Sequence, residues 1–380
     1  DIAASGGGPP RLPWALRVEQ GSVGTLSITV LERTLVFRST TFAEGTYEGR
    51  RLGLTDVAGM FGETALGADA TIDLTDDIEL DVTGEWSAPL AGVAASGTVE
   101  LAGTWPDLTI RHELKTPFAA TTTGTMTAGP FRVDVVNEWQ NLAWPPVDGI
   151  ASPSGRLALV GSLDDYRYDG NGTVAVLGRP ASFIVEGTGQ RLLLELARLD
   201  FLPAAPGSGR LRGAGSLDLE SRETTLDVTA TGFDPIWIVS AWPGRLDGTA
   251  RLRASLAPEP NAALDGIRLA GELRGYPVTL GGAAAVMGSD RFRLDALRLD
   301  SGSNRVVLTG ALDRETVSLV VDAKLDELVL LVPDVDGALT AALTVDGTWQ
   351  EPRGNGRVTL SDAAFEGVTL ERLDVEGVAG

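Results

Sequence analysis

The sequence predicts an all-β protein, built as an elongated, mainly antiparallel sheet with few short helices. Three observations predict this fold class. Apolar and polar residues alternate along most of the chain, turn signals separate the alternating segments, and related segments recur at intervals of about 95–100 residues. We therefore expect well over half of the residues to lie in strands and no long helix to form.

The alternation has a period of two residues, which places every second side chain on the same face of a strand. It runs through residues 72–82, 99–105 and 157–163, and again through residues 317–325 and 339–345. Each of these segments is typical of a strand with one apolar face and one solvated face.

Turn signals separate these segments at intervals of roughly 8–12 residues. Asp148-Gly149, Asn171-Gly172 and Asp346-Gly347 are typical of the tight turns that join antiparallel strands. The chain is therefore expected to run as a meander, in which each strand returns beside the one before it.

Helical signals are few. Residues 235–242 and 325–331 are each followed by a proline and then by an Asp-Gly pair, and each predicts a helical turn or two that covers the end of a strand. Residues 195–199 could also be helical, but the segment that matches them, 292–299, alternates like a strand. Both interpretations of residues 195–199 remain open at this point.

Internal repeats indicate how the chain is organised. Residues 172–180 are echoed by residues 271–277, and residues 209–218 by residues 304–313. Repeats of this kind bury their apolar faces on their neighbours along the chain. We expect residues 1–380 to form one elongated repetitive segment with approximate repeat starts near 85, 172, 271 and 356. Because the chain begins with Asp1 and ends inside a strand pattern, we also expect it to be a piece of a longer protein.

Composition excludes several classes of function. The net charge is −21, and the only lysines are Lys115 and Lys324, so the chain lacks the basic surface that nucleic acids or anionic headgroups would need. It has no cysteine, which excludes disulfides, zinc–thiolate sites and thiol nucleophiles. No stretch of about 18 apolar residues is present that could span a bilayer.

The sequence contains no catalytic or metal-binding signature, so we expect no enzyme, no metal and no cofactor. The only histidine, His112, is expected to lie on the solvated face of a strand rather than to act as a general base. A run of acidic residues could bind calcium, but a solvated strand face with its turn is favoured because the spacing of a calcium loop is absent; the run comprises Asp73, Asp76, Asp77, Glu79 and Asp81. The tryptophans, Trp86, Trp105, Trp139, Trp144 and Trp349 among them, are expected to pack at strand ends rather than to form a carbohydrate platform.

The apolar face of the strands is the one candidate functional surface. If the sheet bends into a trough, this face forms a groove for acyl chains, and its exposure would be explained by a ligand. If a second sheet faces it, side chains simply fill the interior, and both alternatives remain open. The candidate lining residues are Val99, Leu101, Leu157, Leu159, Leu163, Val306, Leu308, Leu312, Val317, Leu319, Val321, Leu339, Leu343 and Val345.

Three sets of segments carry a resemblance to a known family. They are the run Asn137-Glu-Trp-Gln-Asn-Leu-Ala-Trp-Pro-Pro146 with residues 151–166, the repeats 271–277 and 304–313, and the run Gly347-Thr-Trp-Gln-Glu-Pro-Arg-Gly-Asn-Gly-Arg357. All of them resemble the middle β-repeat region of the TamB (translocation and assembly module subunit) family, which is related to the AsmA-like group. The resemblance extends over most of residues 85–380. It implies a β-taco, a curved sheet with a hydrophobic groove.

The resemblance also implies a function. Proteins of this family are anchored in the inner membrane by an N-terminal helix, cross the periplasm, and meet the outer-membrane barrel partner TamA through a C-terminal region; neither the helix nor that region is expected within these residues. The implied role is a non-enzymatic conduit that carries phospholipid between the two membranes and supports outer-membrane biogenesis. The alternative is a chaperone-like factor that assists outer-membrane protein and autotransporter assembly by β-augmentation. A β-solenoid adhesin is disfavoured because its repeats would be much shorter.

Overall fold

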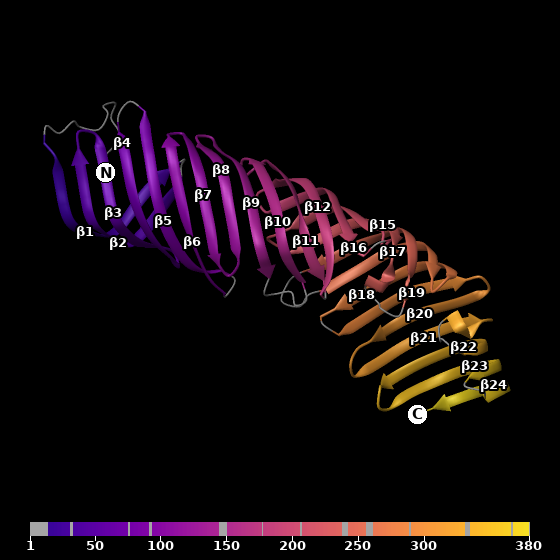
Figure 1. The fold of residues 1–380 in the computed structure, drawn as a ribbon. Coiled ribbons are helices and arrows are strands. Elements are labelled where there is room, and N and C mark those ends of the chain that lie inside the picture. The colour runs from indigo at the N-terminus through magenta and orange to yellow at the C-terminus, as the bar shows by residue number, and fades with distance from the viewer. Residues whose placement is uncertain are drawn as a thin grey trace. The chain divides into compact units, whose positions relative to one another are not determined.

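The computed structural model describes residues 14–30, 33–74, 77–90, 93–143, 150–176, 178–205, 207–237, 242–255, 261–288, 290–330, 335–365 and 368–379. In this part of the chain, 24 strands belong to one open, curved antiparallel sheet, with two 3-10 helices of three residues each (Figure 1). The prediction of an all-β, mainly antiparallel sheet with few short helices is therefore confirmed. The chain divides into two compact units, Asp1–Gly178 with Thr188–Arg191, and Arg179–Gly187 with Leu192–Gly380.

The first unit contains eleven complete strands. Each pairs antiparallel with the next strand in the chain, so the expected meander is confirmed here. The predicted positions of the turns were wrong, because Asn171-Gly172 lies within the strand Tyr166–Val176 and Asp346-Gly347 within the strand Asp336–Thr348. Asp148-Gly149 lies outside the described residues. The strands are β1 (Leu16–Val30), β2 (Arg33–Glu48), β3 (Arg51–Phe61), β4 (Thr64–Leu74), β5 (Ile78–Leu90), β6 (Val93–Thr104), β7 (Asp107–Thr116), β8 (Ala119–Ala128), β9 (Phe131–Ala143), β10 (Ile150–Gly161) and β11 (Tyr166–Val176).

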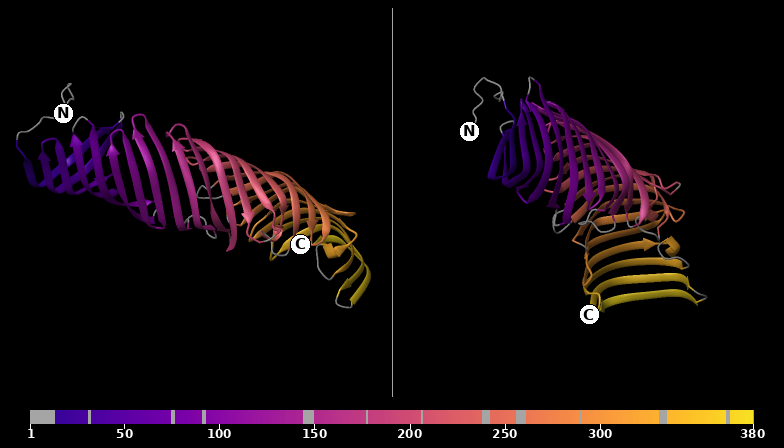
Figure 2. Two further views of the ribbon diagram at one scale, coloured as in Figure 1. Left: turned by 45° about the horizontal axis from the view of Figure 1, so that its top comes forward. Right: turned by 60° about the vertical axis from the view of Figure 1, so that its left-hand side comes forward.

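The second unit continues the same pattern of antiparallel neighbours from β13 to β24 (Figure 2). The residues of β12 (Arg179–Gln190) are divided between the two units. The remaining strands are β13 (Leu193–Pro203), β14 (Arg210–Asp218), β15 (Glu223–Phe233), β16 (Gly244–Ser255), β17 (Asn261–Leu273), β18 (Tyr276–Met287), β19 (Arg291–Ser301), β20 (Asn304–Leu312), β21 (Thr316–Leu325), β22 (Asp336–Thr348), β23 (Pro352–Phe365) and β24 (Val368–Ala379).

Short polar side chains and glycines close the turns. Between β17 and β18 the chain reverses at Arg274 and Gly275, which both have positive φ, as a two-residue hairpin turn that matches the twist of the strands requires. The turns after β14 and β20 are closed by an aspartate whose Oδ1 accepts from two backbone N–H groups: Asp218 from Glu220 and Ser221, and Asp313 from Glu315 and Thr316. Both aspartates lie in the segments that the sequence pairs as repeats.

β-Bulges shift the alternation in several strands. The pairing of β13 with β14 shifts between Leu196 and Leu199, and the pairing of β19 with β20 shifts between Leu294 and Leu297. The extra residue moves the apolar side chains from even to odd positions while keeping them on the same face of the sheet. Residues 195–199 therefore lie in a strand, and their helix-like spacing of Leu196 and Leu199 comes from the bulge.

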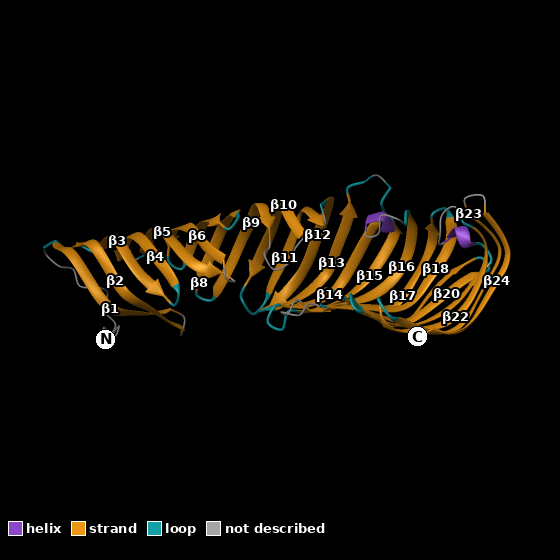
Figure 3. Cartoon of the chain, turned by 90° about the horizontal axis from the view of Figure 1, so that it is seen from below, coloured by secondary structure: helices purple, strands orange, loops and turns teal. Residues whose placement is uncertain are grey.

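The two short helices lie where sequence predicts helical turns. η1 (Pro235–Trp237) follows β15 and η2 (Leu328–Leu330) follows β21, as the purple segments in Figure 3 show. Each is held by a side-chain oxygen. Asp234 Oδ1 accepts from Ile236 N and Gly244 N, and Asn304 Oδ1 accepts from Asp326 N and Glu327 N. Residues 238–241 and 331 of the predicted segments lie outside the described residues.

The approximate repeat starts at residues 85, 172, 271 and 356 fall in β5, β11, β17 and β23. These strands are six apart in chain order, and η1 and η2 also follow strands six apart. A repeat of six strands would account for the spacing of about 95–100 residues. The division of the chain into these repeats stays a prediction.

Candidate functional site: the apolar face of the sheet

Cross-strand pairing brings the predicted lining residues of the second unit onto one face. Partners in a ladder share a face, so an unbroken chain of partners defines a row of side chains across the strands. One row runs from Leu308 through Val321 and Leu343 to Gly356, and the next from Gly310 through Leu319 and Val345 to Gly354. A third row contains Leu299, Val306, Ala323, Ala341 and Val358. A fourth row contains Phe292, Leu312, Val317 and Gly347.

The first unit builds an equivalent face. One apolar row crosses all eleven strands: it begins with Val18, Gly45 and Leu54 and continues through Ala70, Val82, Leu101, Ile110, Gly124, Val135, Leu159 and Tyr168. Val99 and Leu157 lie in the row beside it. In each unit, alternation and strand register together place the apolar side chains on one face of the sheet, which we call the apolar face.

Leu163 is the exception among the predicted lining residues. β10 ends at Gly161, and Leu163 lies in the turn that follows, with 52% of its surface exposed. The turn forms because Ser162 N donates to Asp165 O and Asp165 N donates to Ser162 Oγ. The alternation of Leu157, Leu159 and Leu163 in the sequence thus continues past the end of the strand.

No second sheet is laid on the apolar face by the described residues. Within each unit, the strands mainly contact the strands before and after them in the chain. The two short helices add contacts of η1 with β16 and of η2 with β22. Most predicted lining residues are half-buried, and Val317 is 3% exposed. Val375 on β24, which lies on the apolar face opposite Val358, is 52% exposed. All strands of the described residues belong to one open sheet.

The helix η1 closes part of this face in the second unit. Trp237 is buried and packs its ring edge-on against Phe201, with 5.2 Å between ring centroids. The Arg179 guanidinium donates to the carbonyl of Ile236, and the two residues border a largely apolar depression with Pro180 and Ala204. Helical turns therefore cover strand ends, as the sequence predicts, and leave the middle of the strands open.

One row of the apolar face in the first unit is polar, and it corrects the prediction for His112. His112 pairs with Val99 on β6 and Thr122 on β8, so it lies on the apolar face and not on the solvated one. Its ring stacks on Trp86 at 5.7 Å between centroids, and Trp86 Nε1 donates to His112 Nε2 at 3.0 Å. Burial lowers the pKa of His112. The sequence signal that places it here is Ile110 and Leu114, two residues away on either side.

The tryptophans also differ in part from their expected places. Trp86 and Trp139 lie within strands, opposite Gly97 and Gly155, whose missing side chains leave room for the indoles. Trp105 and Trp349 lie at strand ends and are largely exposed, and Trp349 Nε1 donates to the carbonyl of Asp313. Trp144 lies outside the described residues.

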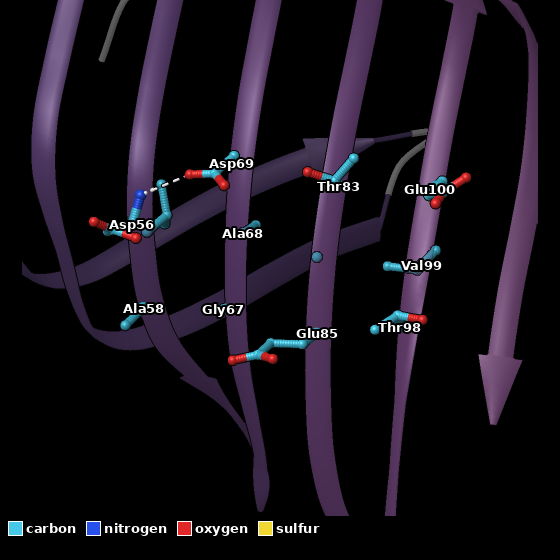
Figure 4. A pocket seen from close by; sticks show the side chains of 12 residues that line it. Asp56, Ala58, Gly67, Ala68, Asp69, Thr83, Glu85, Thr98, Val99 and Glu100 are labelled. Carbon is cyan, nitrogen blue, oxygen red and sulfur yellow. Dashed lines mark hydrogen bonds between the residues drawn. The ribbon is translucent and has the colours of Figure 1, made fainter. Parts of the chain in front are cut away.

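The opposite, polar face carries the acidic residues. In the first unit, two rows of side chains border a shallow depression there (Figure 4). They include Asp69 and Glu100 in one row and Glu85 in the other, and Asp69 Oδ1 accepts from the backbone N–H of Asp56 at 2.8 Å. Among the described residues no group of three histidine, cysteine or acidic side chains could hold a metal ion; Asp76 of the acidic run lies outside them.

Arginine–aspartate pairs cover the polar face of the second unit. Asp200 is 3% exposed and accepts from Arg212 Nε at 2.7 Å and from Arg198 Nη2 at 2.6 Å. Hydrogen bonds from Arg212 and then Arg198 lower the pKa of Asp200 to about 2. Asp300 is held in the same way by Arg298 and Arg305, one predicted repeat later.

Comparison with known proteins identifies one family. The family model described as "TamB, N-terminal domain" matches residues 9–379. No curated protein and no solved structure matches the chain. None of the helices in the described part of the chain has the length and apolar character needed to cross a membrane.

Proposed function

Because this chain belongs to the TamB family, we propose that it is a non-enzymatic conduit that carries phospholipid between the inner and outer membranes along its apolar face. The resemblance inferred from the sequence is confirmed for the family, which is a transport-related one. Phospholipid as cargo, the periplasmic location, the inner-membrane anchor outside these residues and the partner TamA are parts of the proposal.

The observation that carries the proposal is the set of apolar rows that run from strand to strand within each unit. Each row offers a lipid chain a similar set of aliphatic contacts, and each methylene that leaves water contributes about 0.8 kcal/mol. Movement along an apolar row, from one strand to the next, replaces aliphatic contacts by similar aliphatic contacts, so the free energy of a bound acyl chain changes little in that direction. The headgroup stays in water because no second sheet covers the face in the described residues.

The test charges one row of the apolar face. The variant Leu308→Asp, Val321→Asp, Leu343→Asp places three carboxylates side by side on β20, β21 and β22. The matched control, Val307→Asp, Val320→Asp, Ala342→Asp, adds the same charges to the polar face of the same strands. Circular dichroism and thermal unfolding compare the folding of the two variants.

We expect the wild-type chain and the control to retain phospholipid when purified without detergent, as measured by native mass spectrometry with lipid extraction, and to move a labelled phospholipid between vesicles. The charged row should abolish both. A folded variant that transfers lipid normally would contradict the proposal. A wild-type chain that carries no lipid would favour the assembly-chaperone alternative.

A second variant tests the same face at exposed positions, where added charge should not impair folding. Leu373 and Val375 lie on the apolar face of β24 and are 46% and 52% exposed, so Leu373→Asp with Val375→Asp adds charge with little loss of packing. We expect this pair to weaken lipid retention in the second unit while the unfolding temperature stays within a few degrees of wild type.

A further inference from the structure

A polar row crosses the apolar face of the first unit. His112 on β7, Thr122 on β8 and Asn137 on β9 are successive cross-strand partners, so their side chains stand next to one another on the same face. The rows on both sides are apolar, with Ile110 and Val135 on one side and Leu114 on the other. Polar groups within an apolar surface need partners, which makes their hydrogen bonds informative.

The contact with Trp86 fixes the protonation of His112. An indole N–H can only donate, so His112 Nε2, which accepts it at 3.0 Å, carries no hydrogen. The neutral imidazole then carries its hydrogen on Nδ1. The bond from Trp86 is the hydrogen bond that the described residues make to this ring, and Nδ1 is not one of the buried atoms that lack a partner. The Nδ1 hydrogen is therefore open to an acceptor from outside the chain.

Thr122 and Asn137 fix a second donor. Thr122 Oγ1 donates to Asn137 Oδ1 at 2.7 Å, and Asn137 Nδ2 donates one hydrogen to the carbonyl of Leu157 at 3.2 Å. An amide nitrogen carries two hydrogens, so one donor remains while the amide oxygen is already engaged. The row therefore offers two oriented donors.

The surroundings favour a neutral acceptor. Val99 and Thr122 face His112 from the neighbouring strands, and the charged neighbours Arg111 and Glu113 of its own strand lie on the opposite face, where they pair with each other. Glu100 on β6 also lies on that opposite face. None of the described residues paired with this row places a cation on the apolar side, so the row does not match a phosphate or a carboxylate, which prefer charged donors.

Resting on the proposed function, we propose that His112 and Asn137 form a hydrogen-bond donor site for the ester carbonyl oxygens of a diacyl lipid whose chains lie on the apolar face. Ester carbonyls are neutral acceptors attached directly to the acyl chains, so they reach this depth when the chains contact the apolar rows. The site pauses a passing lipid and selects ester-linked lipids over ether-linked ones.

The experiment compares two lipids that differ only in their linkage. A short-chain diacyl phosphatidylcholine and its dialkyl ether analogue of equal chain length are titrated as monomers into the wild-type chain by calorimetry. Two hydrogen bonds of ordinary strength give a preference of about tenfold for the diester. A carbon-13 label on the ester carbonyl adds a direct readout, since its infrared band should move to lower frequency on binding.

Variants test the residues. His112→Leu with Asn137→Leu should bind both lipids equally, at the affinity of the ether, and should leave the carbonyl band unshifted. Thr121→Leu with Glu138→Leu, on the polar face of β8 and β9, should keep the tenfold preference. If the double variant fails to fold, the wild-type comparison and the infrared band still decide.

Each outcome has a distinct meaning. Equal binding of both lipids by the wild-type chain, with an unshifted carbonyl band, would overturn the donor site and leave the conduit standing. Absence of binding of either lipid would overturn the conduit itself, and the donor site with it.

Discussion

At Gly310 a glycine is required by the geometry of the sheet. Its φ is 139°, and a Cβ built there would lie 2.0 Å from the carbonyl oxygen of Ser318 on the neighbouring strand. L residues rarely adopt this conformation, so any side chain would bring both backbone strain and a steric clash. Gly281 on β18 offers a contrast, because its nearest non-neighbouring atom is 3.5 Å from such a Cβ.

Gly310→Ala is therefore expected to lower the free energy of unfolding by more than about 2 kcal/mol, the cost of a strained backbone with a displaced neighbouring strand. The matched change Gly281→Ala should move it by less than about 1 kcal/mol. Chemical denaturation of the two variants beside the wild type measures both. Equal effects at the two sites would contradict the geometric account.

The protonation of His112 should make the stability of the first unit depend on pH. Its folded-state pKa is lowered from 6.5 because burial disfavours the charged ring. The unfolded chain then binds a proton at His112 more readily than the folded chain does. The contribution of the neutral ring to the free energy of unfolding is therefore fully present above about pH 6.5 and is lost as the pH falls below that value. Protonation also removes the acceptor for Trp86 Nε1.

Since His112 is the only histidine, its proton resonance can be followed without overlap. We expect a midpoint below 6.5 in the native state and a return toward the ordinary value in Trp86→Leu, which exposes the ring. A native midpoint at or above 6.5 would show that the ring is not desolvated.

At the scale of the elements, the short helices depend on single capping side chains. Asn304 is 5% exposed and its Oδ1 accepts from Asp326 N at 2.6 Å and from Glu327 N at 3.1 Å, just before η2. Removing this oxygen leaves two donors without their partner at a buried position. Leu328, the first residue of η2, is 7% exposed and depends on that turn for its place.

Asn304→Ala should therefore cost about 1–2 kcal/mol of stability, typical of a lost cap. Amide exchange should speed up at residues 326–329 before it does elsewhere in β21. Ser303→Ala, in the exposed turn next to it, serves as the control and should leave exchange unchanged. Uniform acceleration along β21 would mean that Asn304 supports the strand and not the helix.

At the scale of the whole molecule, the dominant feature is apolar surface that no second layer of the described chain covers. Exposed side chains such as Phe292 and Val375 lie on the same face as the half-buried rows in the second unit. A net charge of −21 opposes the tendency of such a surface to self-associate.

The native chain should consequently bind a hydrophobic fluorescent dye without any denaturant, and phospholipid should displace the dye. The triple variant at Leu308, Val321 and Leu343 should reduce the signal, whereas the control triple on the polar face should not. A native chain that leaves the dye dark would mean that the apolar face is covered.

The sequence alone determined the fold class, the meander and the composition of the two faces. These features are local, because alternation with period two acts over a few positions along the chain. For this reason the predicted lining residues of each unit share one face of its strands, with Leu163 beyond the end of its strand. The predicted turn pairs did not locate the turns, since Asn171-Gly172 lies within β11 and Asp346-Gly347 within β22. The sequence could also have predicted that His112 lies on the apolar face, because the apolar residues Ile110 and Leu114 flank it at positions i−2 and i+2.

Only the tertiary structure decided how the strands register with one another. The bulge between Leu196 and Leu199 looks helical in the sequence, and the polar row of His112, Thr122 and Asn137 comes from three separate strands. The open state of the apolar face in the described residues was likewise undecided by alternation, which is the same for a covered and an uncovered sheet. Register and covering depend on contacts between residues distant in sequence, and no local pattern specifies them.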